Sequence, residues 1–232
     1  MLHILTEGLA QMGLPTCAAP RLAEFAGMVL EKNKVMNLTA ITDPADFAAL
    51  HLLDSAVLLN IADFRGKTVV DVGTGAGFPG VPLRILEPDF DLTLLDSLGK
   101  RVTFLQETCA KMGLERVEAV HARAEEFAAD YRERYDIATS RAVAALNVLS
   151  ELALPLVRVG GSFLAMKSVD SDDEIDAARG AIGQLGGRIR EIRDYAIPGA
   201  DVRHRVVIID KVRPTPPAYP RAFAKIKKNP LK

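Results

Sequence analysis

A glycine-rich segment follows directly on an apolar, β-branched run. The run Thr68–Val72 is followed by glycines at positions 73, 75, 77 and 80. Glycine permits positive φ and lets the backbone approach a ligand closely, and the start of a following helix offers unpaired N–H groups. Open α/β sheets bind nucleotides at such turns. The segment therefore predicts a nucleotide-binding turn, although a tight turn without a ligand is an alternative.

The spacing of these glycines indicates which nucleotide fits. The dinucleotide fingerprint requires a third glycine three places after the second, and Phe78 occupies that place. The G-K-[ST] of a triphosphate-binding loop is also missing. Asp96 ends the next apolar run, where a carboxylate can accept hydrogen bonds from a ribose. Gly73, Gly75 and Asp96 together therefore suit a mononucleoside cofactor, for which S-adenosylmethionine is the obvious candidate.

Strand-like and helix-like stretches alternate through the middle of the chain. This alternation is typical of βαβ units and a parallel sheet covered on both faces. The last two strand-like runs are joined by only five residues, too few for a parallel crossover, so they should be antiparallel. The sequence thus predicts an α/β fold, mostly parallel with a terminal antiparallel hairpin. The expected strands are 68–72, 92–96, 117–121, 136–140, 161–166, 187–195 and 203–212, and the expected helices are 100–112, 144–157 and 170–185.

The two ends of the chain differ from its middle. Residues 1–62 look helical, with apolar residues at helical spacing from Leu22 and a cap followed by proline at Asp43–Pro44. We predict an N-terminal helical extension at 1–62, a nucleotide-binding domain at 63–212 and an irregular basic tail at 213–232. From Lys211 to the end there are seven cations and no Asp or Glu. Such a tail favours a polyanionic partner, or simply aids solubility.

Composition excludes several other classes. With 232 residues, 49% hydrophobic and 25% charged, the chain has the composition of a globular protein. No apolar run is long enough to span a membrane, and the N-terminus does not resemble a secretory signal. The two cysteines suit a reducing compartment, and the four histidines show no metal-ligand spacing. We therefore expect a cytoplasmic protein with neither a metal site nor a membrane partner.

Several further motifs accompany the glycine-rich segment. The set is Asp71-Val72-Gly73-Thr74-Gly75-Ala76-Gly77-Phe78-Pro79-Gly80, Leu94-Leu95-Asp96-Ser97-Leu98-Gly99-Lys100-Arg101, Asn33-Lys34, Asn37-Leu38-Thr39, His51-Leu52-Leu53-Asp54-Ser55, Arg123-Ala124-Glu125-Glu126 and Ser140-Arg141-Ala142. Together these motifs resemble the RsmG (GidB) family, bacterial methyltransferases that modify a guanine N7 of small-subunit ribosomal RNA. The resemblance is strong over residues 31–167. One departure is Lys32, which stands where many members have Trp.

The resemblance implies a Rossmann-like class I fold, S-adenosylmethionine as cofactor and 16S ribosomal RNA as substrate. It implies that Ala124 and Glu125 contact adenine, that Phe78 covers the cofactor and that Arg141 lies in the cofactor pocket. The fork of Arg141 could instead engage guanine or phosphate. Because N7 carries a lone pair and no proton, no catalytic base is expected. His51 and Asp54 are expected to form a hydrogen-bonded pair that braces the N-terminal helices.

The target base should be unpaired or flipped, because the deep major groove of A-form RNA excludes side chains. The substrate could be naked RNA, the 30S subunit or an assembly intermediate. A methyltransferase of small molecules or proteins, an NAD(P)-dependent oxidoreductase and a non-catalytic RNA-binding protein are alternatives. Lys167 could reach RNA or solvent, and other candidates for phosphate contacts are Lys32, Lys34, Lys100, Arg101, Arg123 and the tail.

Overall fold

The computed structural model describes residues 1–141 and 143–232, and within them seven strands form one sheet. The strands run in the spatial order β3-β2-β1-β4-β5-β7-β6. The first five are parallel to one another, whereas β7 is antiparallel to both β5 and β6. This confirms the predicted sheet with its terminal hairpin. Their bounds are β1 (Lys67–Val72), β2 (Phe90–Asp96), β3 (Val117–His121), β4 (Tyr135–Arg141), β5 (Val157–Ser168), β6 (Gly187–Ala196) and β7 (Arg203–Lys211).

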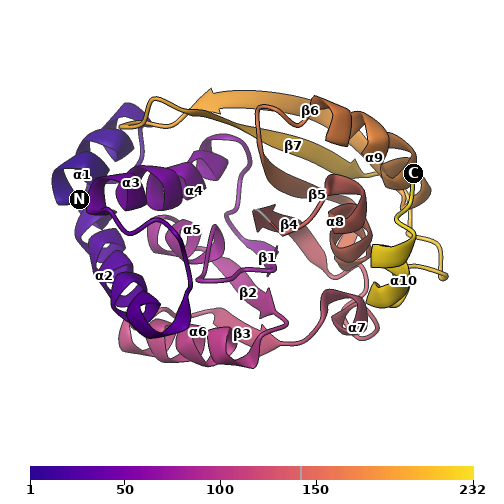
Figure 1. Ribbon diagram of the computed structural model, residues 1–232, viewed down its shortest axis with the longest axis horizontal. Helices are drawn as coiled ribbons and strands as arrows, with labels where there is room; N and C mark the ends of the chain where they lie inside the picture. Colours follow the sequence, from indigo (N-terminus) through magenta and orange to yellow (C-terminus); the bar gives the residue numbers. More distant parts are fainter. Residues whose placement is uncertain (142) are drawn as a thin grey trace.

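Helices pack on both faces of the sheet (Figure 1). One face is covered by the N-terminal helices together with α5 and α6, and the other by α7 to α10. The first group comprises α1 (Leu2–Gln11), the 3-10 turn Thr16–Ala18, α2 (Ala19–Met36), α3 (Pro44–Phe47), the π-helix Ala48–Leu53, α4 (Asp54–Ala56), the 3-10 turn Val57–Asn60, α5 (Gly80–Leu86) and α6 (Gly99–Lys111). The second comprises α7 (Ala124–Phe127), α8 (Leu146–Ala153), the 3-10 turn Leu154–Leu156, α9 (Asp172–Gln184) and α10 (Phe223–Lys228).

Alternate residues of each strand enter two separate hydrophobic cores. In β1, Val69 packs into the core under the N-terminal helices, whereas Val70 and Val72 pack into the core under α8 and α9. A parallel sheet buried on both faces needs apolar residues at consecutive positions, which explains the β-branched runs in the sequence. Leu5 and Phe25 share the first core with strand residues. The helical segment 1–62 therefore packs directly on the sheet, and the division of the chain at 62 and 212 stays a prediction.

Two local expectations were wrong. The predicted helix 144–157 ends at Ala153 and passes through a 3-10 turn into β5, which begins at Val157 rather than at position 161. Pro155 stands in that turn, and proline cannot continue an α-helix because it lacks the N–H. The segment 213–232 was expected to be irregular, but residues 223–228 form α10.

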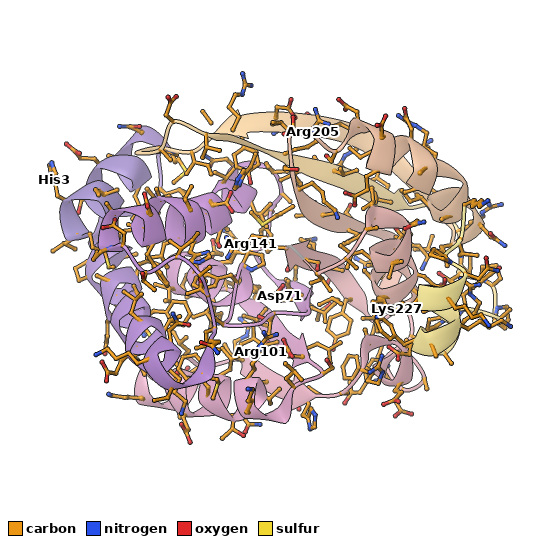
Figure 2. All side chains as sticks on the ribbon, viewed as in Figure 1. His3, Asp71, Arg101, Arg141, Arg205 and Lys227 are labelled. Atoms are coloured by element: carbon orange, nitrogen blue, oxygen red, sulfur yellow. The ribbon has the colours of Figure 1, made fainter. Side chains whose placement is uncertain are left out.

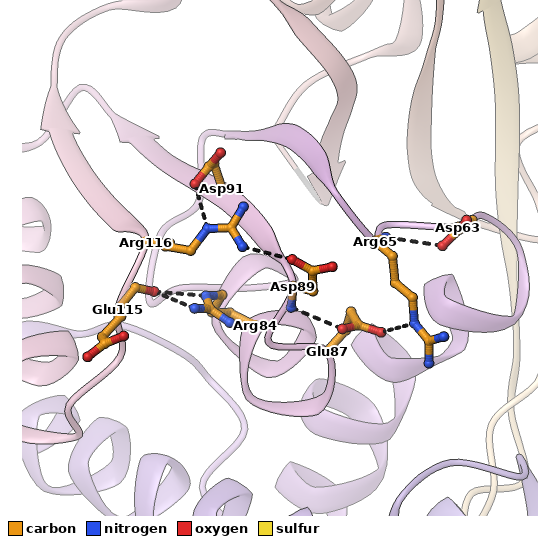
Figure 3. A network of polar contacts seen from close by, with 8 residues as sticks. All are labelled: Asp63, Arg65, Arg84, Glu87, Asp89, Asp91, Glu115 and Arg116. Atoms are coloured by element: carbon orange, nitrogen blue, oxygen red, sulfur yellow. Dashed lines mark hydrogen bonds and ion pairs between the residues drawn. The ribbon is translucent and has the colours of Figure 1, made fainter.

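A charged network lies at the amino ends of β1, β2 and β3, opposite the glycine-rich turn (Figure 3). Arg116 donates hydrogen bonds to Asp89 at 2.9 Å and Asp91 at 2.8 Å. Arg65 pairs with Glu87 at 2.8 Å. Because these pairs are exposed and screened by solvent, each contributes little to stability. These pairs connect the segments that lead into β1, β2 and β3, and every carboxylate in them is neutralised by an arginine. We therefore assign the network a structural role at this end of the sheet.

Asp54 joins the N-terminal helices to the end of the sheet. Its carboxylate is fully buried and accepts hydrogen bonds from Arg141 at 3.0 Å, Tyr195 at 2.7 Å and His204 at 2.9 Å. These donors come from β4, β6 and β7. Burial opposes ionisation of Asp54, but the hydrogen bond from His204 and the charge of Arg141 hold its pKa below the usual value. Asp54 is therefore an ionised hub that three strands share.

His51 does not pair with Asp54, so the predicted direct contact was wrong. The two residues are connected through Arg141, which donates to His51 Nδ1 at 2.8 Å. Since a guanidinium can only donate, Nδ1 accepts, and Nε2 donates to Thr39 Oγ1 at 2.7 Å. Burial and the charge of Arg141 lower the pKa of His51 from 6.5 to about 3. His51 is therefore neutral at physiological pH and braces the helices as an uncharged ring.

In the part of the chain that the structure describes, no helix combines the length and the apolar character needed to cross a membrane.

Removing the Tyr195 hydroxyl tests the role of Asp54 as a hub. We expect Tyr195→Phe to lower the free energy of unfolding by about 1.5–3 kcal/mol, because a hydrogen bond to a buried carboxylate is lost. Urea denaturation followed by circular dichroism measures the change. Tyr131→Phe is the matched control, since no hydroxyl hydrogen bond of Tyr131 is found among the described residues. Equal losses in the two variants would contradict the assignment.

Candidate active site

The glycine-rich turn connects the carboxyl end of β1 to α5. Gly73, Gly75 and Gly77 have φ of 71°, 61° and 101°, which is the left-handed region that favours glycine. A Cβ added at Gly77 would lie 2.8 Å from Val81 and 3.0 Å from Leu105, whereas one added at Gly75 would meet nothing within 4 Å. Gly77 is therefore required by packing, and Gly75 faces open space where a ligand can approach.

The buried carboxylate of Asp71 fixes the shape of this turn. One oxygen accepts from Thr74 Oγ1 at 2.7 Å and from the Gly80 amide at 3.0 Å. The other accepts from Thr139 Oγ1 at 3.1 Å. Burial raises the pKa of Asp71 from 3.8 to about 6, although these hydrogen bonds oppose the shift. Figure 2 places Asp71 in the interior of the molecule, near Arg141. Asp71 therefore ties both ends of the turn to β1 and β4.

Asp96 supports the turn from β2. Its oxygens accept from the Gly75 amide and from the Leu98 amide, each at 2.9 Å. Leu98 is the N-cap of α6 and has no side-chain cap bond, so Asp96 does not act as the helix cap. Each carboxylate oxygen can accept a second hydrogen bond. Asp96 thus retains acceptor capacity for the ribose hydroxyls that the sequence assigned to it.

Most amides of the turn are bonded within the protein. Those of Gly73 and Thr74 donate to the Leu95 carbonyl, and those of Gly77 and Phe78 to the Thr74 carbonyl. The Gly80 amide at the start of α5 donates to Asp71. The expectation that this helix start offers free N–H groups was therefore wrong at its first residue. A cradle of free amides is what phosphate needs, and the observed bonding does not provide one.

Four of the seven predicted cofactor residues lie around one pocket of about 160 Å³: Gly73, Asp96, Ala124 and Glu125. Ala124 and Glu125 begin α7, and Glu125 pairs with Arg123 at 2.5 Å while its side chain is 9% exposed. The volume is below the roughly 300 Å³ at which drug-sized ligand sites begin. A nucleoside cofactor would therefore extend from this pocket along the turn.

The other three predicted residues, Gly75, Phe78 and Arg141, do not line this pocket. Phe78 is 5% exposed and packs among aromatic rings, stacked on His51 with ring centroids 4.7 Å apart. The guanidinium of Arg141 lies 5.0 Å from the Phe78 ring. The ring of Phe78 is thus a core element, and its role toward a cofactor stays a prediction.

Arg141 lines a second pocket, of about 570 Å³, beside the ends of β4 and β5. His51, Lys167, Glu174 and His204 also line it. Lys167 donates to the Ala144 carbonyl at 2.7 Å and pairs with Glu174 at 2.5 Å, so it is neither a free surface cation nor directed into bulk solvent. Because β1 and β4 are neighbours, the two pockets lie along the same edge of the sheet.

Sequence reasoning gave no role to Asp71 and missed Phe223, which also lines the smaller pocket. A carboxylate within an apolar strand run was the available signal for Asp71, since a buried charge requires hydrogen-bond donors. Phe223 lies 150 residues beyond Gly73 in a segment without periodicity, and nothing local marks it. Among residues 1–141 and 143–232, no group of three or more His, Cys, Asp or Glu could hold a metal ion.

The raised pKa of Asp71 predicts a characteristic pH dependence. Because the folded state binds the proton more tightly, this group stabilises the fold fully below about pH 4, and the contribution is lost as pH rises to about 6. We expect the free energy of unfolding of Asp71→Asn, relative to the natural chain, to rise by about 3 kcal/mol between pH 4 and pH 7. Urea denaturation across this range measures it.

Asp91→Asn is the control for that experiment. Asp91 is exposed, and its hydrogen bond to Arg116 lowers its pKa. Its contribution to stability is present above the ordinary pKa of 3.8 and is lost only at lower pH, so its difference from the natural chain should stay nearly constant between pH 4 and pH 7. A stability difference for Asp71→Asn that does not vary with pH would show that this carboxyl titrates normally.

Comparison with known proteins identifies the family. The GidB family model, described as rRNA small subunit methyltransferase G, matches residues 18–195. Two relatives carry the name Ribosomal RNA small subunit methyltransferase G. The one from Symbiobacterium thermophilum is 47% identical over 240 residues, covering 98% of this chain and 97% of the relative. The one from Clostridium perfringens strain 13 is 44% identical over 211 residues, covering 90% and 88%.

Solved structures agree at the level of the fold. M. jannaschii TYW2 in complex with AdoMet superposes with a TM-score of 0.55 at 14% identity, over 68% of this chain and 75% of that one. At this identity the likeness concerns only the Rossmann-like fold. The family match and the relatives extend over most of the chain, including every residue of the smaller pocket up to Leu152. The chain is therefore a methyltransferase and belongs to the GidB family of rRNA small subunit methyltransferases G.

Proposed function

We propose that the protein transfers the methyl group of S-adenosylmethionine to N7 of a guanine in 16S ribosomal RNA. The bonding of the glycine-rich turn is the observation that supports this proposal best. Two carboxylates, Asp71 and Asp96, accept amides of the turn. Negative charge behind a turn with few free amides disfavours a pyrophosphate and favours a cationic ligand. S-adenosylmethionine carries a sulfonium, whereas NAD(P) carries a pyrophosphate.

In this proposal the smaller pocket receives the nucleoside end of the cofactor. Asp96 accepts the ribose hydroxyls with the lone pairs that Gly75 and Leu98 leave free. Ala124 and Glu125 lie at the edge of the pocket, where a backbone amide and a carboxylate can read adenine. Gly75 allows the methionine part to pass close to the backbone, whereas an added Cβ at Gly73 would lie 2.6 Å from the Val143 side chain, so Gly73 contributes through its place on the pocket wall. Arg141 is excluded from this set, because it lines the second pocket.

The second pocket is where we place the target guanine. It lies at the ends of β4 and β5, along the same edge of the sheet as the smaller pocket, and contains both donors and a carboxylate, Glu174. Guanine presents acceptors at O6 and N7 and donors at N1 and N2. Arg141 is held by Asp54 and His51, so it can position a base without moving. We assign Arg141 a positioning role for the substrate.

When bound, the cofactor would supply an electrophilic methyl carbon to the lone pair of guanine N7, with the thioether sulfur as the leaving group. Because N7 carries no proton, none of the buried acids of this chain is needed as a base. The contribution of the chain is alignment of N7 with the methyl carbon, which can supply several kcal/mol. Buried walls such as Val72 and Leu95 limit water near the site.

We propose the 30S subunit or an assembly intermediate as the RNA partner and the cytoplasm as the location. The base must leave the helix, because side chains cannot enter the A-form major groove. Lys100 is exposed at the start of α6, beside the carboxyl edge of the sheet, and can contact phosphate. Arg101 and Arg123 are already paired with Asp96 and Glu125, respectively, and can contribute only through their outer faces.

A single methyl group at Gly75 tests the cofactor site. Gly75→Ala places a Cβ in the open space beside Asp96. We expect affinity for S-adenosylmethionine to fall at least about tenfold, or about 1.4 kcal/mol, by isothermal titration calorimetry. The left-handed backbone itself costs about 1–2 kcal/mol of stability when it carries a side chain.

Gly113→Ala is the matched control. Gly113 has φ of 60°, close to the 61° of Gly75, and an added Cβ there also meets nothing within 4 Å. It follows α6 at the opposite edge of the sheet. This variant should lose the same stability and keep the natural affinity. Equal affinities in the two variants would remove Gly75 from the cofactor site.

Mapping the methylated nucleotide tests the reaction. We expect small subunits that lack the modification, incubated with labelled S-adenosylmethionine and the protein, to gain label at one guanine of 16S RNA. Primer extension after cleavage at 7-methylguanine identifies the position and the atom. Parallel reactions with naked 16S RNA determine which substrate is used. Label on ribosomal protein, on small molecules or on no component would reject the proposed function.

A further inference from the structure

The C-terminal segment, residues 213–232, is bound to the body of the protein by a buried ion pair. Glu151 of α8 is fully buried and accepts hydrogen bonds from Arg221 Nε at 2.8 Å, Nη2 at 2.7 Å and the backbone amide at 2.9 Å. A bidentate pair of this geometry is among the stronger polar contacts in proteins. Arg221 is therefore an anchor of the segment and not a free cation.

Further contacts hold the segment on both sides of Arg221. Arg132 donates to the carbonyls of Thr215 and Tyr219 at 2.5 and 2.7 Å. Ile226 of α10 has no exposed surface and packs into the core under α8. Near the end of the chain, Asn147 donates to the Leu231 carbonyl at 2.8 Å. The segment is thus docked along its length, beside α7 and α8 (Figure 1).

This docking brings Phe223 to the cofactor pocket. Phe223, the first residue of α10, lines the pocket with Gly73, Asp96, Ala124 and Glu125. The guanidinium of Arg123 lies 4.4 Å from the centre of its ring and also pairs with Glu125. Phe223 is partly buried and packed against the same core as Ala124. Its ring is therefore oriented by the residues that flank the expected adenine position.

We propose that Phe223 is a cofactor-binding residue that forms one wall of the adenine pocket. The inference rests on the proposed function, because it requires an adenine nucleoside in this pocket. A partly buried aromatic ring offers a face or an edge to a flat base, and such contact stabilises a bound base substantially. Arg221 and Ile226 position the wall without reaching the ligand. Cofactor binding and docking of the C-terminal segment then stabilise each other.

A tryptophan at this position reports the contact directly, since the natural chain contains none. We expect Phe223→Trp to change its fluorescence on titration with S-adenosylhomocysteine, with a midpoint equal to the Kd from calorimetry on the same protein. Lys228→Trp is the control, because Lys228 is exposed on the same helix and does not line the pocket. Its fluorescence should not respond to S-adenosylhomocysteine.

Truncation of the ring measures its contribution. We expect Phe223→Ala to weaken both S-adenosylhomocysteine and adenosine about tenfold, whereas Phe223→Tyr keeps most of the affinity. Equal loss for the two ligands locates the effect at the adenine end, which they share. Limited proteolysis, with and without S-adenosylhomocysteine, shows whether the segment of Phe223→Ala remains docked.

The outcomes separate the inference from the function it rests on. If the natural chain binds S-adenosylhomocysteine but Phe223→Trp stays silent and Phe223→Ala keeps full affinity, the inference is overturned and the proposed function stands. The same holds if Lys228→Trp responds as strongly as Phe223→Trp, because the signal would then report movement of the whole helix. If the natural chain binds no S-adenosylhomocysteine, the proposed function and the inference fail together.

Discussion

Two buried carboxylates accept hydrogen bonds from the glycine-rich turn, and the rest of the site depends on this constraint. Asp71 accepts hydrogen bonds from the Thr74 hydroxyl and the Gly80 amide, which lie on either side of Gly77 in the turn. Asp96 accepts a hydrogen bond from the amide of Gly75. The left-handed glycines let the chain bend tightly enough for all three contacts. Because the amides are occupied, the turn contributes shape and negative charge to a ligand, whereas a phosphate-binding turn contributes donors. A glycine-rich turn therefore binds phosphate only if its amides are free, and here they donate to acceptors within the protein.

A third buried carboxylate, Asp54, determines how the N-terminal helices pack on this edge of the sheet. It binds donors from β4, β6 and β7, so the antiparallel hairpin and the helices meet at one charge. Removing one partner from such a cluster leaves a buried charge uncompensated, which is costly. Arg141 gains a fixed orientation from this arrangement, with Asp54 and His51 on its nitrogens and Phe78 under its plane. The position of Arg141 in the second pocket therefore depends on the contacts that Tyr195 and His204 of the hairpin make with Asp54, although the hairpin is remote from the turn in sequence.

The sequence was sufficient for the strands, the reversal of the last two, and the glycine-rich turn, because each depends on local periodicity or on a connection too short for a crossover. It was also sufficient for the residues that gather at Gly73 and Asp96, since the carboxyl ends of neighbouring parallel strands must meet at one edge. It was not sufficient for the partners of Asp54, which depend on packing between residues about 140 positions apart. The early start of β5 was missed although Pro155 marked it, because apolar residues continue through that point.

The charge count from Lys211 to the end of the chain could not distinguish cations that anchor the chain from cations that stay exposed. Lys211 is fully buried and donates to the carbonyls of Leu154 and Val157, and Arg221 is consumed by Glu151. Cations that serve as anchors inside a protein are indistinguishable in sequence from cations that bind RNA. Buried anchors are needed only where a segment must be held at a defined place. Arg221 and Ile226 hold the chain where Phe223 lines the smaller pocket. The remaining exposed lysines of α10 then project from a helix already fixed beside that pocket, so any phosphate contact they make is oriented by the same anchors.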